Sequence, residues 1–67
     1  MKVTVNGKIM ELEEGTHLPA LVERLVDNPK GLAVAVDGSV VPRSEWQSVM
    51  LGEGMNVEVV RAVQGGS

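Results

Sequence analysis

Few side chains in this 67-residue sequence could take part in chemistry, and most of them lack partners for it. His17 is the only histidine and there is no cysteine, so neither a catalytic triad nor a zinc site of the usual His and Cys ligands can be assembled. The glutamates within residues 11–14 form an acidic cluster. A general acid–base pair, however, needs a shaped cleft that separates two pKa values, and so short a chain has little room for one. We expect these groups to be solvated and the protein to be no enzyme.

The end of the chain offers a different chemistry, because Gly65 and Gly66 precede a single Ser67. If Gly66 were the last residue, transfer of AMP from ATP would turn its carboxylate into a mixed anhydride, which a sulfur or amine nucleophile can attack. Glycine suits such an end because the lack of a Cβ lets the backbone enter a narrow channel. The same composition is typical of flexible linkers at chain termini, so the tail alone leaves both interpretations open.

The composition argues against several other classes of protein. The net charge is −3, the six basic residues are spread along the chain, and Trp46 is the only aromatic residue, whereas nucleic-acid binding usually needs a basic stripe and often stacking aromatics. No apolar run approaches the roughly 20 residues that span a bilayer, and the N-terminus lacks the apolar region of a signal peptide. We therefore expect no nucleic-acid partner, no membrane association and a cytoplasmic location.

Two segments of the first half of the chain have recognisable periodicities. Alternating residues around Asn6-Gly7 predict strands over residues 2–6 and 8–13, joined by a two-residue turn. Apolar residues then recur at helical spacing and predict a helix over residues 17–27. Thr16 is its expected N-cap, Pro19 falls in its first turn, and Asn28-Pro29 should end it. The first half therefore predicts a hairpin followed by one helix.

The second half of the chain predicts three further strands. A run from Leu32 to Val36 is followed by a turn at Asp37-Gly38 and a short strand at Val40-Val41, which Pro42 should confine to a sheet edge. Ser44 and Gln47 have the spacing of a capping box around one short turn that carries Trp46. A Gly-Glu-Gly turn, which lacks the lysine of a phosphate-binding loop, then leads into an alternating last strand from about residue 55.

The order strand-strand-helix-strand-strand-strand predicts an α+β fold. A right-handed crossover through the helix would place the first and last strands side by side and parallel. This is the β-grasp, or ubiquitin-like, roll: a mixed sheet of four to five strands with one main helix packed on one face. With no internal repeat and no interdomain linker, we expect one domain over residues 1–62 and a flexible tail over residues 63–67. Its core should be aliphatic, with Trp46 as a cap.

Three stretches of the sequence together resemble a known family. They are "MKVTVNGK" at the start, "AVAVDGSVVPRSEW" in the middle and "VEVVRAVQGG" at the end. The chain resembles, over essentially its whole length, the ThiS family of sulfur carriers of thiamin thiazole biosynthesis. That family belongs to the ubiquitin-like group, which also holds the small subunit of molybdopterin synthase. The Val-Pro-Arg-Ser-x-Trp run and the Ala-Val-Gln-Gly-Gly ending favour the thiazole branch.

The resemblance implies a function for the tail. A ubiquitin-activating-type adenylyltransferase would use ATP and magnesium to adenylate Gly66, and a sulfur relay that starts from cysteine would convert the adenylate to a thiocarboxylate. Thiazole synthase would then take the sulfur for joining to a deoxyxylulose phosphate skeleton and a glycine-derived imine. On this reading the carrier binds no cofactor itself and is a monomer when alone. The lack of cysteine agrees, since the sulfur would be carried on an acyl carbon.

The residues around the tail are the expected contacts of these partners. Small and apolar side chains on the sheet face away from the helix would let another protein approach closely. Arg61 could either steer the tail or simply solvate the end of the strand. The predicted set of sulfur-carrying and partner-binding residues is Gly66, Gly65, Val60, Arg61, Ala62, Val63, Gln64, Ala33 and Ala35.

Several alternatives remain open from the sequence. The carrier could serve molybdopterin, cysteine or a secondary metabolite, or the chain could be a ubiquitin-like binding module without tail chemistry. It could also be a modifier that is conjugated to proteins through an isopeptide bond. Ser67 is the anomaly in all carrier readings, because it holds the carboxyl group of Gly66 in an amide bond. Either a protease removes it from a precursor, or it was added to the natural chain when the protein was made.

Overall fold

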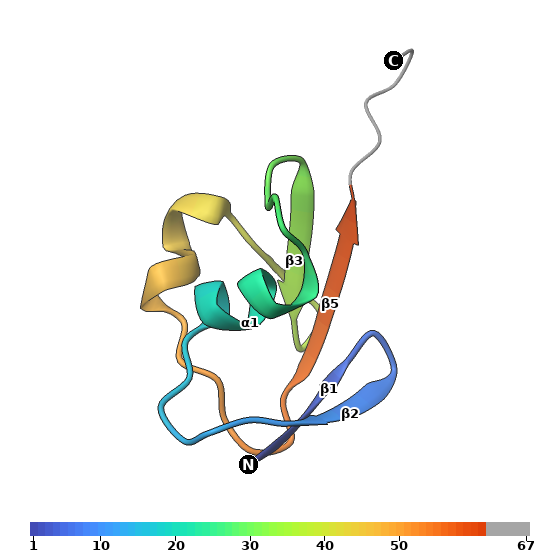
Figure 1. Ribbon diagram of the computed structural model, residues 1–67, viewed down its shortest axis with the longest axis vertical. Coiled ribbons are helices and arrows are strands. Elements are labelled where there is room, and N and C mark those ends of the chain that lie inside the picture. Colours follow the sequence, from blue (N-terminus) through green and yellow to red (C-terminus); the bar gives the residue numbers. More distant parts are fainter. Residues whose placement is uncertain (62–67) are drawn as a thin grey trace.

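One helix packs against one face of a mixed sheet whose strand order is β2-β1-β5-β3-β4 (Figure 1). The computed structural model describes residues 1–61. Its elements are β1 (Lys2–Val5), β2 (Lys8–Glu11), α1 (Leu18–Leu25), β3 (Leu32–Val36), β4 (Ser39–Val41), the 3-10 helix η1 (Arg43–Ser48) and β5 (Asn56–Arg61). The order and the five-stranded sheet agree with the fold predicted from the sequence.

The two predicted hairpin turns are confirmed and share one geometry. Asn6 and Gly7 have φ values of 51° and 82°, and Asp37 and Gly38 have values of 50° and 87°. Positive φ at both central residues gives the turn a twist that matches the flanking strands. Asn, Asp and Gly are the residues that reach this region most readily, so these two dipeptides determine where β1–β2 and β3–β4 reverse direction.

The last strand lies in the middle of the sheet. β5 pairs with β1 in parallel, with Val5 opposite Val57, and with β3 in antiparallel fashion, with Val34 opposite Val59. The predicted parallel pairing of the first and last strands is therefore confirmed. β4 lies at the edge of the sheet and ends directly before Pro42, which agrees with the place of proline at strand edges and ends.

The core lies between α1 and the sheet and is almost entirely aliphatic. Alternate residues of the strands point toward the helix, and no polar or charged residue of the described chain is buried. The buried hydrophobic residues are Val3, Val5, Leu12, Leu18, Leu21, Val22, Val34, Trp46, Leu51, Val57 and Val59. Trp46 is thus part of the core, as expected, and its indole Nε1 donates a hydrogen bond to the Val41 carbonyl at 2.9 Å.

The helix is shorter than predicted, and its predicted cap is wrong. It covers Leu18–Leu25 in place of residues 17–27, because Val26 is already extended, with φ −142° and ψ 153°. The Thr16 hydroxyl donates to the Glu13 carbonyl at 2.6 Å and does not cap the helix. His17 occupies the N-cap position without a side-chain hydrogen bond, and a proline in the first turn leaves one fewer amide to satisfy.

The predicted capping box around Trp46 is also wrong. Glu45 N donates to the Pro42 carbonyl at 2.8 Å, so the 3-10 helix begins one residue before Ser44, which lies inside it. Pro42 takes the cap position with no side-chain hydrogen bond. The first two strands are shorter than predicted as well, since Asn6 belongs to the turn and the β1–β2 register ends at the pair Lys2 and Glu11.

Candidate functional site

The site that the sequence predicts lies where β5 ends, and the described chain contains its first part. Val60 and Arg61 are the last two residues of β5, and both are exposed. The predicted site residues at 62–66 lie outside the described residues. β5 is paired with β1 at Asn56 and Val57 and with β3 as far as Arg61.

A small apolar surface adjoins the end of β5 on the sheet face that is turned away from α1. Ala33 pairs with Val60, and Ala35 pairs with Val40 across the hairpin and with the exposed Glu58 of β5 on its other side, so a carboxylate borders this surface. Directly opposed residues share a face, and their neighbours Val34 and Val59 are buried against the helix. We call Ala33, Ala35, Val40 and Val60 the outer patch. Val40 is 74% exposed and Val60 is 57% exposed. The patch therefore consists of two protruding valine side chains beside two small alanine side chains.

Sequence reasoning placed Val60, Ala33 and Ala35 on this face, but it missed Val40. A signal for Val40 was present in the sequence. In a two-residue hairpin at Asp37-Gly38, the residues that flank the turn must pair, and counting outward brings Ala35 opposite Val40. Ile9 is also exposed and lies on the same face, opposite Thr4, but strand β1 separates it from β5 and the outer patch.

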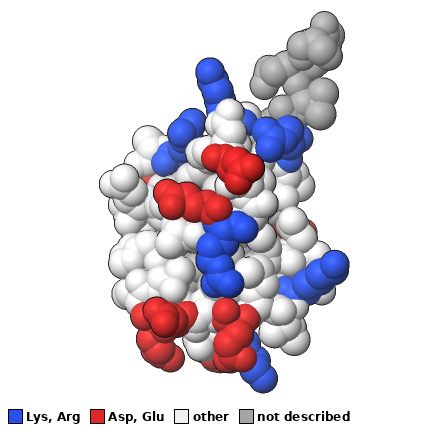
Figure 2. Space-filling model, in the orientation of Figure 1, with Lys and Arg blue, Asp and Glu red and all other residues white. Residues whose placement is uncertain are grey.

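Arg61 has a contact that neither predicted role for it included. Its guanidinium Nη1 donates to the Lys30 carbonyl at 3.2 Å, in the connection between α1 and β3. The side chain therefore braces the last residue of β5 against a neighbouring loop. Figure 2 shows several basic side chains at the end of the molecule at which β5 finishes, with acidic side chains directly beside them, and further acidic side chains with a basic one at the opposite end.

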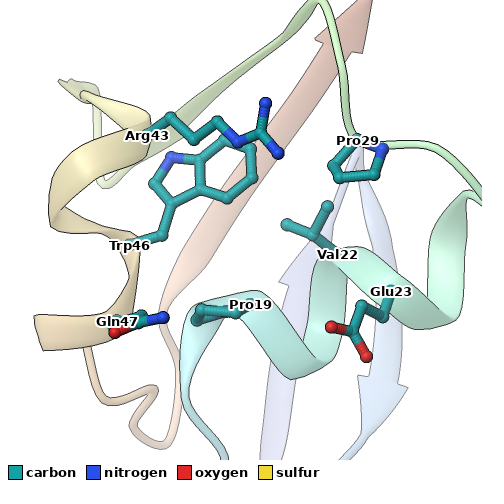
Figure 3. Close-up of a pocket in the computed structure, with 7 residues that line it drawn as sticks. All are labelled: Pro19, Val22, Glu23, Pro29, Arg43, Trp46 and Gln47. Carbon is teal, nitrogen blue, oxygen red and sulfur yellow. The ribbon is translucent and has the colours of Figure 1, made fainter.

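A second feature, on the helix side of the sheet, is an open pocket of about 180 Å³ between α1 and η1 (Figure 3). The Arg43 guanidinium lies over the Trp46 ring, 6.0 Å from its centroid. Pro19 and Val22 of the helix form the apolar side. The Val-Pro-Arg-Ser-x-Trp run therefore serves mainly to close one end of the core. The pocket lies on the helix side, so it does not adjoin the outer patch.

The other groups considered from the sequence do not form a site in the described part of the chain. His17 is exposed, and its Nδ1 lies 3.0 Å from the Gly15 carbonyl. Within residues 1–61, no group of three or more His, Asp or Glu side chains is placed to hold a metal ion. The helices described here are all too short or too polar to cross a membrane. The end of β5 with the outer patch is therefore the candidate site.

Comparison with known proteins relates the sheet, the helix and the following residues up to Gly66 to one family. The family model that matches is that of the ThiS family, over residues 3–66. The sulfur carrier protein ThiS of Escherichia coli (strain K12) is 26% identical over 66 residues, which are 98% of this chain and 100% of that protein. A thiazole synthase of Magnetococcus marinus (strain ATCC BAA-1437 / JCM 17883 / MC-1) is 36% identical over 66 residues, which are 98% of this chain but only 20% of that protein.

Solved structures show the same relation. The crystal structure of the thiamine biosynthesis protein ThiS from Geobacter metallireducens has a TM-score of 0.86 and 28% identity, and covers 98% of this chain and 100% of that one. A solution structure of a thiamine biosynthesis protein from the same organism has a TM-score of 0.77 and 27% identity, over 100% of this chain and 90% of that one. The fold is thus the ubiquitin-like β-grasp. Since the family match runs from β1 through both glycines and ends at Gly66, the chain belongs to the ThiS family, the small sulfur carrier proteins of thiamine biosynthesis.

Proposed function

We propose that Gly66 carries the sulfur, as a thiocarboxylate on its α-carboxyl group. The observation that carries this proposal is the family match, which takes in Gly65 and Gly66 and stops before Ser67. The structure of the body is consistent with it, because β5 leads out of the centre of the sheet toward these residues. No nucleophilic side chain is needed for such a role, which fits a chain without cysteine.

The chemistry proceeds in two steps on a partner enzyme. The Gly66 carboxylate attacks the α-phosphorus of ATP, pyrophosphate leaves, and the product is an acyl adenylate. In the second step the terminal sulfur of a persulfide, from a relay that starts with cysteine, attacks the acyl carbon and AMP leaves. A further thiol then attacks the relay sulfur, which breaks the S–S bond, leaves a disulfide on the relay and releases the Gly66 thiocarboxylate. We propose a ubiquitin-activating-type adenylyltransferase, which binds the ATP and magnesium, as the partner for the first step. The dependence on ATP and on a thiol relay supports a cytoplasmic location.

We further propose thiazole synthase as the protein that takes the sulfur from Gly66. The Magnetococcus relative supports this, because a segment similar to almost all of this chain lies within a protein named thiazole synthase. A carrier that is part of the same polypeptide as its acceptor has a high effective concentration at the acceptor site. The separate chain would reach the same site by docking, with the exposed apolar outer patch as contact surface.

The proposal is tested by the intact mass of a chain that ends at Gly66. Incubation with ATP, magnesium, the adenylyltransferase and a sulfur source should raise the mass by the replacement of one oxygen by sulfur, and omission of ATP should prevent the change. Addition of thiazole synthase with its small-molecule substrates should restore the original mass. A chain that stays unmodified beside an adenylyltransferase active on another carrier would refute the proposal. If thiazole synthase does not take the sulfur but the proteins of molybdopterin synthesis do, the carrier serves the molybdopterin pathway.

The outer patch makes a separate prediction about docking. Val60→Asp should weaken binding to the adenylyltransferase by about tenfold or more, because a charge would be buried against an apolar partner surface. Ile9→Asp is the matched control, since Ile9 is 72% exposed on the same face but lies away from the patch. Both changes share a strand-propensity cost of up to about 1 kcal/mol. Titration by calorimetry measures the difference, and equal affinities for the two variants would exclude the patch as the docking surface for the adenylyltransferase.

A further inference from the structure

The side chain of Asn6 extends the pairing of β5 beyond the end of β1. Strand β1 finishes at Val5, opposite Val57, and the chain then turns away at Asn6-Gly7. The Asn6 backbone N donates to the Val57 carbonyl at 2.9 Å. Its carboxamide then makes two hydrogen bonds to Val59, since Nδ2 donates to the Val59 carbonyl at 3.1 Å and Val59 N donates to Oδ1 at 2.8 Å.

The hydrogen bonds to Val59 require a side-chain donor and acceptor at residue 6, which the turn itself does not require. Glycine would satisfy the turn, which requires only the positive φ of 51°. Aspartate tolerates this φ as well, but its carboxylate accepts hydrogen bonds and cannot donate one to the Val59 carbonyl. Asparagine combines tolerance of the left-handed region with a donor and an acceptor on one short planar group. The residue therefore fits a second role, on β5.

The hydrogen bonds of Asn6 lie close to the tail. Val59 is followed by Val60 and Arg61 and then by the residues that lead to Gly66. On the other side of β5, Leu32 pairs with Arg61, whose guanidinium reaches the Lys30 carbonyl. Without the carboxamide, β5 beyond Val57 would have a hydrogen-bonded neighbour on the β3 side alone. Asn6 thus restores support from the β1 side at a point two residues before the end of the strand.

We infer that Asn6 is a positioning residue for the sulfur-carrying tail: it fixes the position and direction in which the chain leaves the sheet, so that Gly66 meets the ATP of the activating enzyme. This inference rests on the proposed function of Gly66. The root of the tail sets the region that Gly66 can reach, and misplacement of a reacting group lowers the rate of its reaction, so a loosened root should lower the rate of adenylation. Docking through the outer patch should change little, because Val60 stays paired with Ala33 of β3 when the carboxamide is lost.

Asp37 provides a matched control at the other end of the same strand. It has the same turn geometry, with φ 50° followed by a glycine at 87°. Its Oδ1 accepts a hydrogen bond from Asn56 N at 2.9 Å, and its own backbone N donates to the Asn56 carbonyl at 2.7 Å. Asn6 and Asp37 therefore hold opposite ends of β5, and only the end held by Asn6 leads to the tail.

The experiment compares Asn6→Gly with Asp37→Gly in the chain that ends at Gly66. Each variant keeps its turn, but Asn6→Gly loses the two side-chain hydrogen bonds to Val59, whereas Asp37→Gly loses the one side-chain hydrogen bond to Asn56. For Asn6→Gly we expect kcat for ATP-dependent pyrophosphate release to fall about tenfold with little change in KM, whereas Asp37→Gly should stay within about twofold of the parent chain in both constants. Asn6→Asp, which sets a carboxylate against the Val59 carbonyl, should behave like Asn6→Gly. Equal kcat values for the two glycine variants would reduce Asn6 to a purely structural role and overturn the inference.

A second readout does not depend on the chemistry of the tail. Residual dipolar couplings of the Ala62 and Val63 amides should change in Asn6→Gly and stay as in the parent chain in Asp37→Gly. If the parent chain is never adenylated, the proposed function fails, and the couplings still decide whether Asn6 sets the direction of the tail. If the couplings of Asn6→Gly match those of the parent chain, the inference fails whatever the parent chain does with ATP.

Discussion

A chain that ends at Gly66 should be converted to the thiocarboxylate, whereas the same chain with Ser67 should not be converted at all. In the longer chain the carbonyl carbon of Gly66 is part of an amide, which has no carboxylate oxygen to attack ATP. The free carboxylate belongs to Ser67, whose side chain is foreign to the Gly-Gly pattern and whose Cβ would have to enter a channel suited to glycine. The family match also ends at Gly66. The expected difference is therefore all or none.

Intact mass after incubation with ATP, adenylyltransferase and a sulfur source distinguishes the two chains. A chain ending at Gly66 but carrying Gly66→Ala tests whether the channel requires glycine, and it should react far more slowly. Conversion of the 67-residue chain after prior loss of serine would identify Ser67 as a processed residue. Direct addition of sulfur to the intact 67-residue chain would show that Gly66 is not the carrying residue.

Replacement of Trp46 by alanine should remove about a third or more of the stability of the protein. Removal of a large buried aromatic side chain costs about 3–5 kcal/mol, and a domain of this length has a total stability of roughly 3–10 kcal/mol at about 0.05–0.15 kcal/mol per residue. Trp46 is 4% exposed and lies beside the open pocket between α1 and η1. Loss of the indole would join that pocket to the core and admit water, so little of the cost would be recovered by collapse.

Urea denaturation followed by circular dichroism measures this effect without relying on tryptophan fluorescence. Trp46→Phe is the matched control, since it keeps an aromatic ring and loses chiefly the hydrogen bond to the Val41 carbonyl, worth about 1 kcal/mol net. Arg43→Ala removes only the cation over the ring, a contribution of about 0.5–1 kcal/mol at an exposed position. A Trp46→Ala protein as stable as the phenylalanine variant would contradict the assignment of Trp46 to the core.

Local signals in the sequence were sufficient for the element order and for the two hairpin turns. The turns at Asn6-Gly7 and Asp37-Gly38 depend on which residues tolerate positive φ. This property belongs to the two central residues themselves, so it can be predicted without knowledge of the rest of the fold. The alternation of apolar residues then identifies the inner face of each strand. The same alternation placed Val60, Ala33 and Ala35 on the outer face, because each of them lies next to a strand residue that points toward the helix.

Features that depend on distant parts of the chain could not be predicted in this way. The wrong helix caps have a separate and local cause, because the Thr16 hydroxyl donates to the Glu13 carbonyl and Pro42 takes the cap position before Ser44. The hydrogen bonds between Asn6 and Val59 join residues 53 positions apart, and nothing local to Asn6 distinguishes them from an ordinary turn. The contact of Arg61 with the Lys30 carbonyl is likewise a product of tertiary packing.

The central position of β5 also affects how the protein is made. Val57 and Val59 complete a core whose other strands are synthesised much earlier. Pairing of residues so far apart along the chain cannot begin until the last strand has left the ribosome. A polypeptide interrupted before β5 would leave Val5 and Val34 without their neighbours on β5 and would be open to proteolysis. Folding therefore acts as a check on synthesis, since only chains translated through the strand that leads to the glycines become protected.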